Sequence, residues 1–161
     1  YLFEDRFVRG YPSGFSPKLS AALRILEFTY DFAIPDPFFY YVQMLRSRNT
    51  ISGTPTSFNV TVNGNAFTRP IIRITNNGSN VSSIIVENLT TNQSFSYAGS
   101  LVTANTLVFD STDLSIENNG TDDIANFSGD FEFILVPGVN KITVTGLASA
   151  LVKVDWRDRW Y

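Results

Sequence analysis

The most constraining feature of this sequence is a series of short, alternating segments separated by turn residues. From residue 57 onward, stretches of four to six residues alternate apolar and polar side chains, with no helical periodicity between them. The segments are 57–62, 70–75, 82–87, 94–97, 106–109 and 114–117. Their separators are Asn63-Gly64, Asn76-Asn77-Gly78, Asn118-Asn119-Gly120 and Pro137-Gly138. Since Asn and Gly adopt positive φ at low cost, the pattern predicts an all-β fold, an antiparallel β-sandwich or jelly roll.

The last thirty residues show the same alternation of apolar and polar side chains, with larger aromatic residues among them. Phe131, Phe133 and Leu135 alternate along a predicted strand, and Pro137-Gly138 supplies the φ values of a type II turn. A closing strand places one set of side chains on one face: Val152, Val154, Trp156, Asp158 and Trp160. Because chain ends fray unless they are held, two tryptophans this late predict that the last strand belongs to a sheet. We expect Trp156 to lie in the core.

The first fifty residues predict strands of a different kind. Residues 24–34 alternate strictly and predict one long strand, which Pro35 and Pro37 end. We also expect strands at 3–8 and 38–46, a loop around Gly10 to Phe15 and a helical turn at 20–23. The small, polar stretch 50–57 reads as a linker. The predicted domains are therefore residues 1–50, the end of an incomplete domain, and residues 51–161, the sandwich.

Composition removes several classes of function. The chain of 161 residues is 43% apolar, which is ample for a core, and it has no cysteine and no histidine. The usual general base, imidazole ligand and thiolate ligand are thus missing. A net charge of −3 argues against a nucleic-acid surface, and the apolar runs are too short to insert into a membrane. We expect no cofactor, and because the chain begins with Tyr1, we expect it to be a piece of a longer protein.

A set of stretches lies at the joints between these strands, over about residues 24–161. They are Asp36-Pro37-Phe38-Phe39-Tyr40, Asn63-Gly64 with Arg69-Pro70-Ile71, Glu87 to Gln93, Thr106 to Asp110, Ser128-Gly129-Asp130-Phe131, Pro137-Gly138-Val139-Asn140, and Val154 to Trp160 with Trp156, Arg157 and Arg159. Taken in this order, they resemble one known family, the distal tail proteins of long-tailed, siphovirus-type bacteriophages. Each stretch alone is a common turn or strand pattern, and their order carries the resemblance. The joint residues are predicted to be structural.

The resemblance implies a structural virion protein at the distal end of the tail. In that family, subunits form a hexameric ring that joins the tail tube protein to the tail hub and to receptor-binding proteins. The amino-terminal domain forms the ring, and the carboxy-terminal domain is a galectin-like β-sandwich. Residues 1–50 would then be the last strands of the ring domain. The resemblance implies neither an enzyme nor a membrane or nucleic-acid partner.

Other readings stay open at this stage. A carbohydrate-binding sandwich that attaches to host glycans is the main alternative, with Tyr97 and Trp160 as the aromatic residues to stack on sugar. A glycosidase would need paired carboxylates, such as Asp122 with Asp123 or Asp31 with Asp36. Hard oxygen ligands between Asp110 and Asp123 could be imagined as a calcium loop, although their spacing fits no standard motif. For both of these, a solvated turn is the simpler interpretation, so we predict no catalytic or metal-binding residue.

Overall fold

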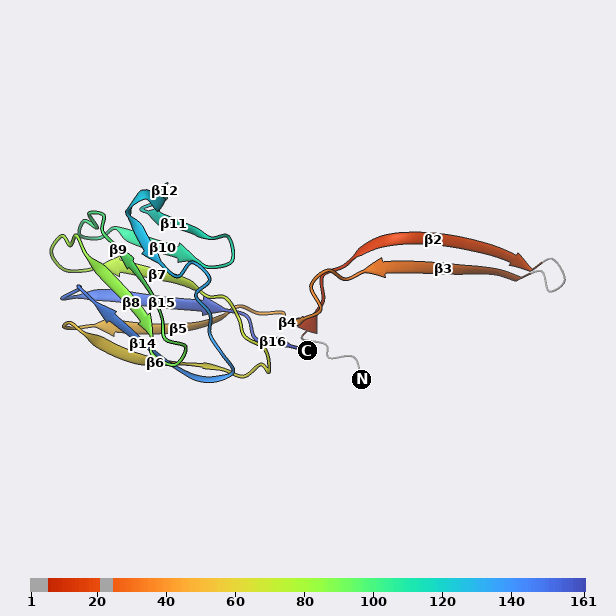
Figure 1. Cartoon of the computed structure of the whole chain (residues 1–161), viewed down its shortest axis with the longest axis horizontal. Coiled ribbons are helices and arrows are strands. Elements are labelled where there is room, and N and C mark those ends of the chain that lie inside the picture. The colour runs from red at the N-terminus through yellow and green to blue at the C-terminus, as the bar shows by residue number, and fades with distance from the viewer. Residues whose placement is uncertain (1–5, 21–24) are drawn as a thin grey trace.

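The structure, a computed structural model, describes residues 6–20 and 25–161 of the chain. It consists of a β-sandwich and a long β-hairpin that extends away from it (Figure 1). The hairpin pairs β2 (Tyr11–Ser20) with β3 (Ile25–Ala33), and we refer to it as the arm. The all-β class predicted from the sequence is confirmed.

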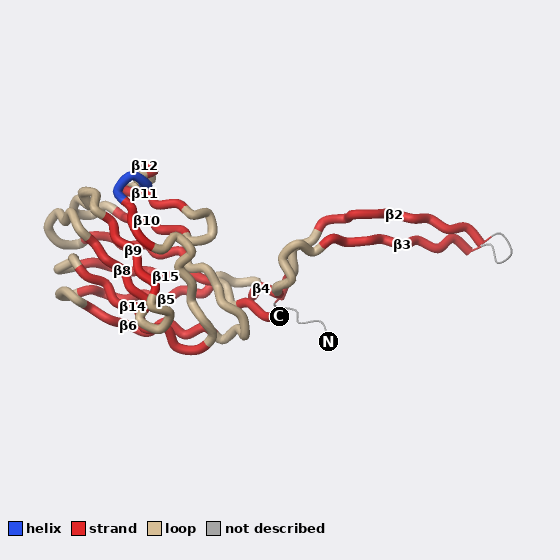
Figure 2. The backbone as a smooth tube through the Cα atoms, viewed as in Figure 1, coloured by secondary structure: helices blue, strands red, loops and turns tan. Residues whose placement is uncertain are grey.

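Two antiparallel sheets form the sandwich (Figure 2). The six-stranded sheet has the order β12 (Thr121–Asp122), β11 (Ser115–Asn118), β10 (Thr106–Asp110), β7 (Ile71–Asn76), β15 (Ala150–Trp156) and β5 (Leu45–Ile51). The five-stranded sheet has the order β13 (Phe127–Gly129), β9 (Gln93–Tyr97), β8 (Ile84–Asn88), β14 (Gly138–Thr145) and β6 (Thr56–Val62). One 3₁₀ helix, η1 (Ile124–Asn126), lies between β12 and β13. Across the described residues, no helix has the length and apolar character needed to cross a membrane.

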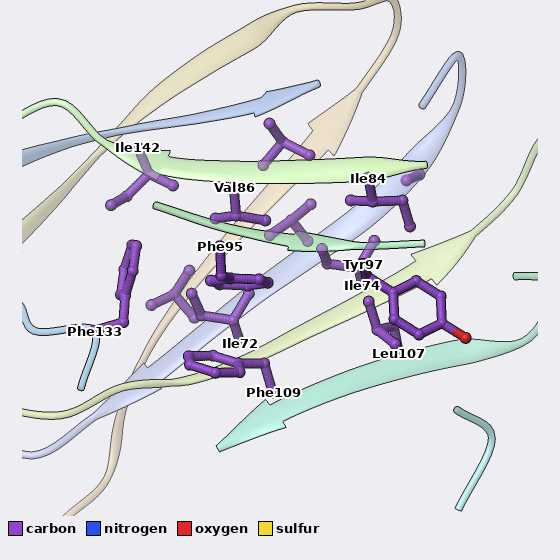
Figure 3. Close-up of a cluster of buried hydrophobic side chains, with 14 of the residues drawn as sticks. Ile72, Ile74, Ile84, Val86, Phe95, Tyr97, Leu107, Phe109, Phe133 and Ile142 are labelled. Atoms are coloured by element: carbon purple, nitrogen blue, oxygen red, sulfur yellow. The ribbon is translucent and has the colours of Figure 1, made fainter. Parts of the chain in front are cut away.

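The core lies between the two sheets and is rich in aromatic rings (Figure 3). Phe95 of the five-stranded sheet stacks on Phe109 of the six-stranded sheet, with ring centroids 4.2 Å apart. Phe133 packs edge-on against Phe95 at 5.7 Å. All three side chains are buried, as are Ile72 and Ile74 on the central strand β7. This packing joins the sheets through alternate side chains, as the period-two pattern of the sequence requires.

A third, small sheet stands where the arm meets the sandwich. Its order is β1 (Arg6–Phe7), β4 (Phe39–Tyr41) and β16 (Arg159–Trp160). It therefore joins the segments on either side of the arm to the last residues of the chain. The last strand is part of a sheet, as predicted, although the chain leaves strand geometry at residues 157–158, between β15 and β16.

The amino-terminal region differs from the sequence prediction in two places. The loop expected up to Phe15 is instead the start of β2, in spite of Pro12, Gly14 and Pro17. A two-stranded hairpin tolerates proline because one edge of each strand carries no ladder partner, and a bulge between Pro12 and Gly14 absorbs the irregularity. The expected strand 24–34 is confirmed as β3 over Ile25–Ala33, and residue 24 lies outside the described residues. Of the strand expected at 3–8, residues 6–7 form β1, and residues 1–5 lie outside the described residues. Of the helical turn expected at 20–23, Ser20 instead ends β2, and residues 21–23 lie outside the described residues.

The stretch 38–46 is also not one strand, because β4 and β5 divide it. β5 pairs with β15 along its whole length, from Leu45 to Ile51, and so is an edge strand of the sandwich. The predicted linker 50–57 is reduced to the turn between β5 and β6. The division into domains at residues 50 and 51 stays a prediction.

The strand predicted over 131–136 is wrong. Phe133 and Leu135 are buried as their alternation indicated, but the segment joins a neighbour only through an isolated bridge from Leu135 to Thr68. Side-chain amides take the place of a ladder, because the Ile134 amide donates to Gln93 Oε1 at 3.0 Å and the Val136 amide donates to Asn140 Oδ1 at 2.9 Å. In this segment the alternation of apolar residues reflects the burial of their side chains, although the backbone does not pair as a strand.

Candidate functional site at the junction of arm and sandwich

Two of the sequence motifs, separated by more than a hundred residues, meet at the base of the arm. β4 pairs with β16 in antiparallel register, with Tyr40 opposite Arg159 and Phe39 opposite Trp160. The Tyr41 amide also donates to the Asp158 carbonyl oxygen at 2.9 Å. The stretch that begins at Asp36 and the terminal stretch from Trp156 therefore form one structure, which we call the junction.

Arg159 is the central side chain of the junction. Its guanidinium carbon lies 3.8 Å from the centroid of the Phe38 ring and 5.1 Å from the centroids of Tyr40 and Phe67. Its Nη2 donates to Asp36 Oδ1 at 3.4 Å, and the whole residue is only 7% exposed. A guanidinium removed from water in this way is stabilised by the ring faces and by a paired carboxylate.

Asp36 bonds both Arg159 and Tyr40, one of the three residues whose rings surround Arg159. The Tyr40 hydroxyl donates a short hydrogen bond to Asp36 Oδ2. Burial raises the pKa of Tyr40, and the hydrogen bond to Asp36 raises it further. Pro35 and Pro37 restrict the backbone on both sides of Asp36, which favours an extended path out of β3. The junction thereby sets the direction in which the arm leaves the sandwich.

Arg157 and Asp158 complete the base of the arm. Arg157 Nη1 donates to the carbonyl oxygens of Tyr41, at 3.1 Å, and Val42. Asp158 Oδ1 accepts from the Trp156 indole nitrogen at 3.0 Å and from the Asn63 amide at 3.2 Å. Trp156 itself is 7% exposed and packs in the core, as predicted from the sequence.

The turn next to the junction, Asn63-Gly64, requires glycine at position 64. A Cβ atom on Gly64 would lie 2.2 Å from the carbonyl oxygen of Arg159, which is backbone and has no room to move. The Asn63-Gly64 turn thus allows β16 to approach closely, and the neighbouring Ala66 amide donates to the same carbonyl oxygen at 3.1 Å.

The remaining motif residues lie away from the junction and shape the sandwich. Asn140 is fully buried, and its side chain bonds both the amide and the carbonyl of Val136. Asp130 accepts from the Ser94 amide at 2.9 Å. The other members are Gly129 and Gly138, both with positive φ, Phe131 against Phe127, Pro137 before β14, and Pro70, whose carbonyl accepts from the Ser111 amide. Their arrangement accords with a structural role, which stays a prediction for each residue.

The two residues expected to stack on sugar, Tyr97 and Trp160, are buried to different extents. Tyr97 is completely buried, which is at odds with a stacking role because no ring face reaches solvent. Its hydroxyl donates to Asp123 Oδ2 at 2.5 Å and accepts from Asn118 Nδ2 at 2.7 Å. Trp160 is half-buried, and the guanidinium of Arg6 lies over its ring at 3.9 Å. One face of Trp160 is thus already covered by protein.

The buried phenol predicts a loss of stability at high pH. Burial raises the pKa of Tyr97 to about 12, and the hydrogen bond to Asp123 adds to the shift. Because the pKa is higher in the folded state than in the unfolded state, this contribution is complete below about pH 10 and is lost as the pH rises through about 12. We expect the unfolding midpoint in urea to fall over that range. In Tyr97→Phe the fall should be shallower, and an identical pH profile would contradict this assignment.

Two of the carboxylates considered for a metal or for catalysis, Asp110 and Asp123, accept hydrogen bonds from groups of the protein itself. Asp110 Oδ1 accepts from the amides of Thr112, at 2.8 Å, and Asp113, at 3.2 Å. Asp123 is held by Tyr97 and Asn126, and these hydrogen bonds, that from Tyr97 first, lower its pKa. Over residues 6–20 and 25–161, no group of three or more acidic, histidine or cysteine residues is placed to hold a metal ion.

Comparison with known proteins assigns the family. Residues 63–160 match the family model SPP1 Dit, described as siphovirus-type tail component, C-terminal domain. The chain therefore belongs to this family, and the resemblance to distal tail proteins is confirmed. It is a structural protein of the phage virion, located in the tail at its distal end.

One solved structure resembles nearly the whole chain. It is the crystal structure of the SPP1 Dit (gp 19.1) protein, described as a paradigm of the hub adsorption apparatus in Gram-positive infecting phages. The match has a TM-score of 0.74 at 14% sequence identity and covers 98% of this chain. The chain spans 62% of the length of that protein, and at this identity the likeness establishes the fold. A search of curated proteins found no match.

Proposed function

We propose that this protein is a ring-forming adaptor at the tail tip, where it joins the tail tube to the tail hub and to receptor-binding components, without catalytic activity. In this proposal the range 1–50 contains the end of the ring domain, and its last residues, in β5, belong to the sandwich. The observation that carries the proposal is the arm, which projects from the sandwich (Figure 1). Large apolar side chains are exposed on it.

The arm has one apolar and one polar face. Residues opposite each other on antiparallel strands share a face, so Phe15 with Tyr30 and Pro17 with Phe28 lie on the same side. Phe32 lies on that side too, because period-two geometry places it with Phe28 and Tyr30. These three aromatic residues are 57%, 61% and 64% exposed, in the order Phe28, Tyr30 and Phe32.

The opposite face carries polar residues such as Ser16 and Thr29, and Lys18 stands opposite Glu27. An isolated two-stranded hairpin is at best marginally stable in water, and a contiguous apolar face of this size marks an interaction surface. We therefore assign the apolar face to contact with a second copy of the protein. The junction supports this contact, because it fixes the direction in which the arm is presented.

Native mass spectrometry of the intact protein tests the proposal. We expect a closed oligomer, six copies in a ring, for the unmodified protein. Phe28→Glu combined with Phe32→Glu places two charges on the apolar face and should give monomers. Thr29→Glu adds a charge on the polar face of the same strand and should leave the ring intact. A monomeric unmodified protein, or equal assembly in both variants, would contradict the role assigned to the arm.

A further inference from the structure

The outer face of the six-stranded sheet carries an unusual row of charges. Lys153 on β15 stands directly opposite Arg48 on β5 and, on its other side, opposite Arg73 on β7. Adjacent strands are about 5 Å apart, so three cations share one line across the sheet. Their neighbours along each strand, including Val152, Val154, Ile72 and Ile74, are buried, which places the row on the side away from the core.

Of the three cations in this row, only Arg73 forms an ion pair with a carboxylate of the described residues. Asp155, which is fully buried, accepts from Arg73 and from Arg46, whose side chains remain 34% and 50% exposed. Arg48 and Lys153 form no ion pair with any of the carboxylates that the structure describes. Like charges on directly opposed positions destabilise a sheet. Protection of the edge strand β5 would explain Arg48, but Lys153 and Arg73 belong to inner strands.

The same row ends in carboxylates at the other edge of the sheet. Beyond Arg73 it continues through Val108 on β10 to Glu117 on β11 and Asp122 on β12. Glu117 and Asp122 are both exposed and directly opposed, so this pair repels as well. The face is therefore cationic along β5, β15 and β7 and acidic along β11 and β12. The charge at each end of the row is therefore opposite in sign to the charge at the other end.

We infer that the cationic end of this row in one sandwich contacts the acidic end of the row in a second copy of the chain. β5 and β12 are the two outermost strands of the sheet, and the arm leaves the sandwich from a different side (Figure 1). Copies placed side by side, with their arms in the same direction, bring these two edges together. Such a contact uses two different patches and so repeats from copy to copy, as a ring requires.

The inference rests on the proposed ring and deepens it, since it gives the sandwiches a contact of their own. Exposed ion pairs are weak and are screened by salt. Tethering through the ring raises the effective concentration of the two patches, so that a weak contact is occupied. The contact should therefore form in assembled protein at low salt and open at high salt, while the ring remains.

Engineered disulfides test the contact without background, because the chain has no cysteine. Thr50→Cys on β5 and Thr121→Cys on β12 leave the charged row unchanged, and both positions are exposed. Mild oxidation of protein with both substitutions should link copies covalently, into a ladder of up to six. Chains with either substitution alone should give at least tenfold less product. Absence of linkage in the double variant would overturn the inference.

Charge-reversal variants test whether a second copy of the chain is the partner of each charged end of the row. Arg48→Glu with Lys153→Glu, or Glu117→Lys with Asp122→Lys, should each reduce linkage about tenfold. Mixing the first pair carrying Thr50→Cys with the second pair carrying Thr121→Cys should restore it. The control Lys141→Glu, on an exposed position of the other sheet, should have no effect. Reduced linkage without rescue would indicate an acidic segment or an anionic glycan as the occupant, and would overturn the inference.

Native mass spectrometry of the same samples separates the two proposals. An intact ring without disulfide linkage overturns the sandwich contact and leaves the adaptor function standing. Linkage between copies that form no ring supports the contact and contradicts the adaptor function. If neither ring nor linkage is found, both proposals fail.

Discussion

Trp156→Ala is expected to lower the free energy of unfolding by about 3–5 kcal/mol, a large fraction of the stability of a domain of this size. The indole is 7% exposed, fills the end of the core at the last residue of β15, and donates to Asp158. Removing it leaves a cavity and takes a partner from Asp158, which also accepts from the Asn63 amide. Urea unfolding followed by circular dichroism measures the effect.

Trp156→Phe is the matched control, since it keeps much of the ring volume and loses only the indole donor. We expect a smaller loss of stability than in Trp156→Ala. A cost below about 1 kcal/mol for the alanine variant, typical of a surface position, would mean that Trp156 is not a core residue.

Arg159→Ala is expected to cost about 2 kcal/mol or more, because a desolvated cation over several ring faces contributes that much on its own. Its aliphatic stem also packs at the junction, so the loss includes buried contact. Arg159→Lys should recover only part of the loss, because an ammonium group lacks the planar surface that stacks on Phe38. Thermal and urea unfolding of the three proteins give the comparison.

Arg69→Ala serves as the control for Arg159→Ala. Its ion pair with Glu132 is exposed, with side chains 36% and 72% accessible, and should contribute about 0.2–1 kcal/mol. Hydrogen exchange provides a local readout, since the Tyr41 amide bonds to the Asp158 carbonyl in the junction. We expect that amide to exchange faster in Arg159→Ala and to stay protected in Arg69→Ala. Equal protection in both would contradict the central place of Arg159.

The sequence predicted those parts of the fold in which local pattern and burial coincide. Short alternating segments with Asn-Gly turns marked strands such as β6, β7 and β10, because their side chains divide between core and solvent. The segment 131–136 has the same alternation but no ladder, since amides of Gln93 and Asn140 satisfy its backbone. In this segment the hydrophobic period identifies buried side chains, such as those of Phe133 and Leu135, but it does not show which backbone groups pair.

The junction and the charged row depend on contacts that local pattern does not contain. The sequence marked the stretch at Asp36 and the stretch at Arg159 separately, but their pairing follows only from the register of β4 with β16. The row of Arg48, Lys153 and Arg73 likewise requires the order of three strands that are distant in the chain. For β3, alternation was identified correctly, yet nothing in the period indicated that its apolar face would be exposed on an arm.

The most direct test of the central claim is electron microscopy of phage tails that contain this protein. We predict a closed ring of copies at the distal end of the tail tube, with the arms inside the contacts between neighbours and the sandwiches outward. In such a ring the β5 edge of each sandwich should face the β12 edge of the next. Single copies on a fibre, or a ring whose arms remain free in solvent, would contradict it.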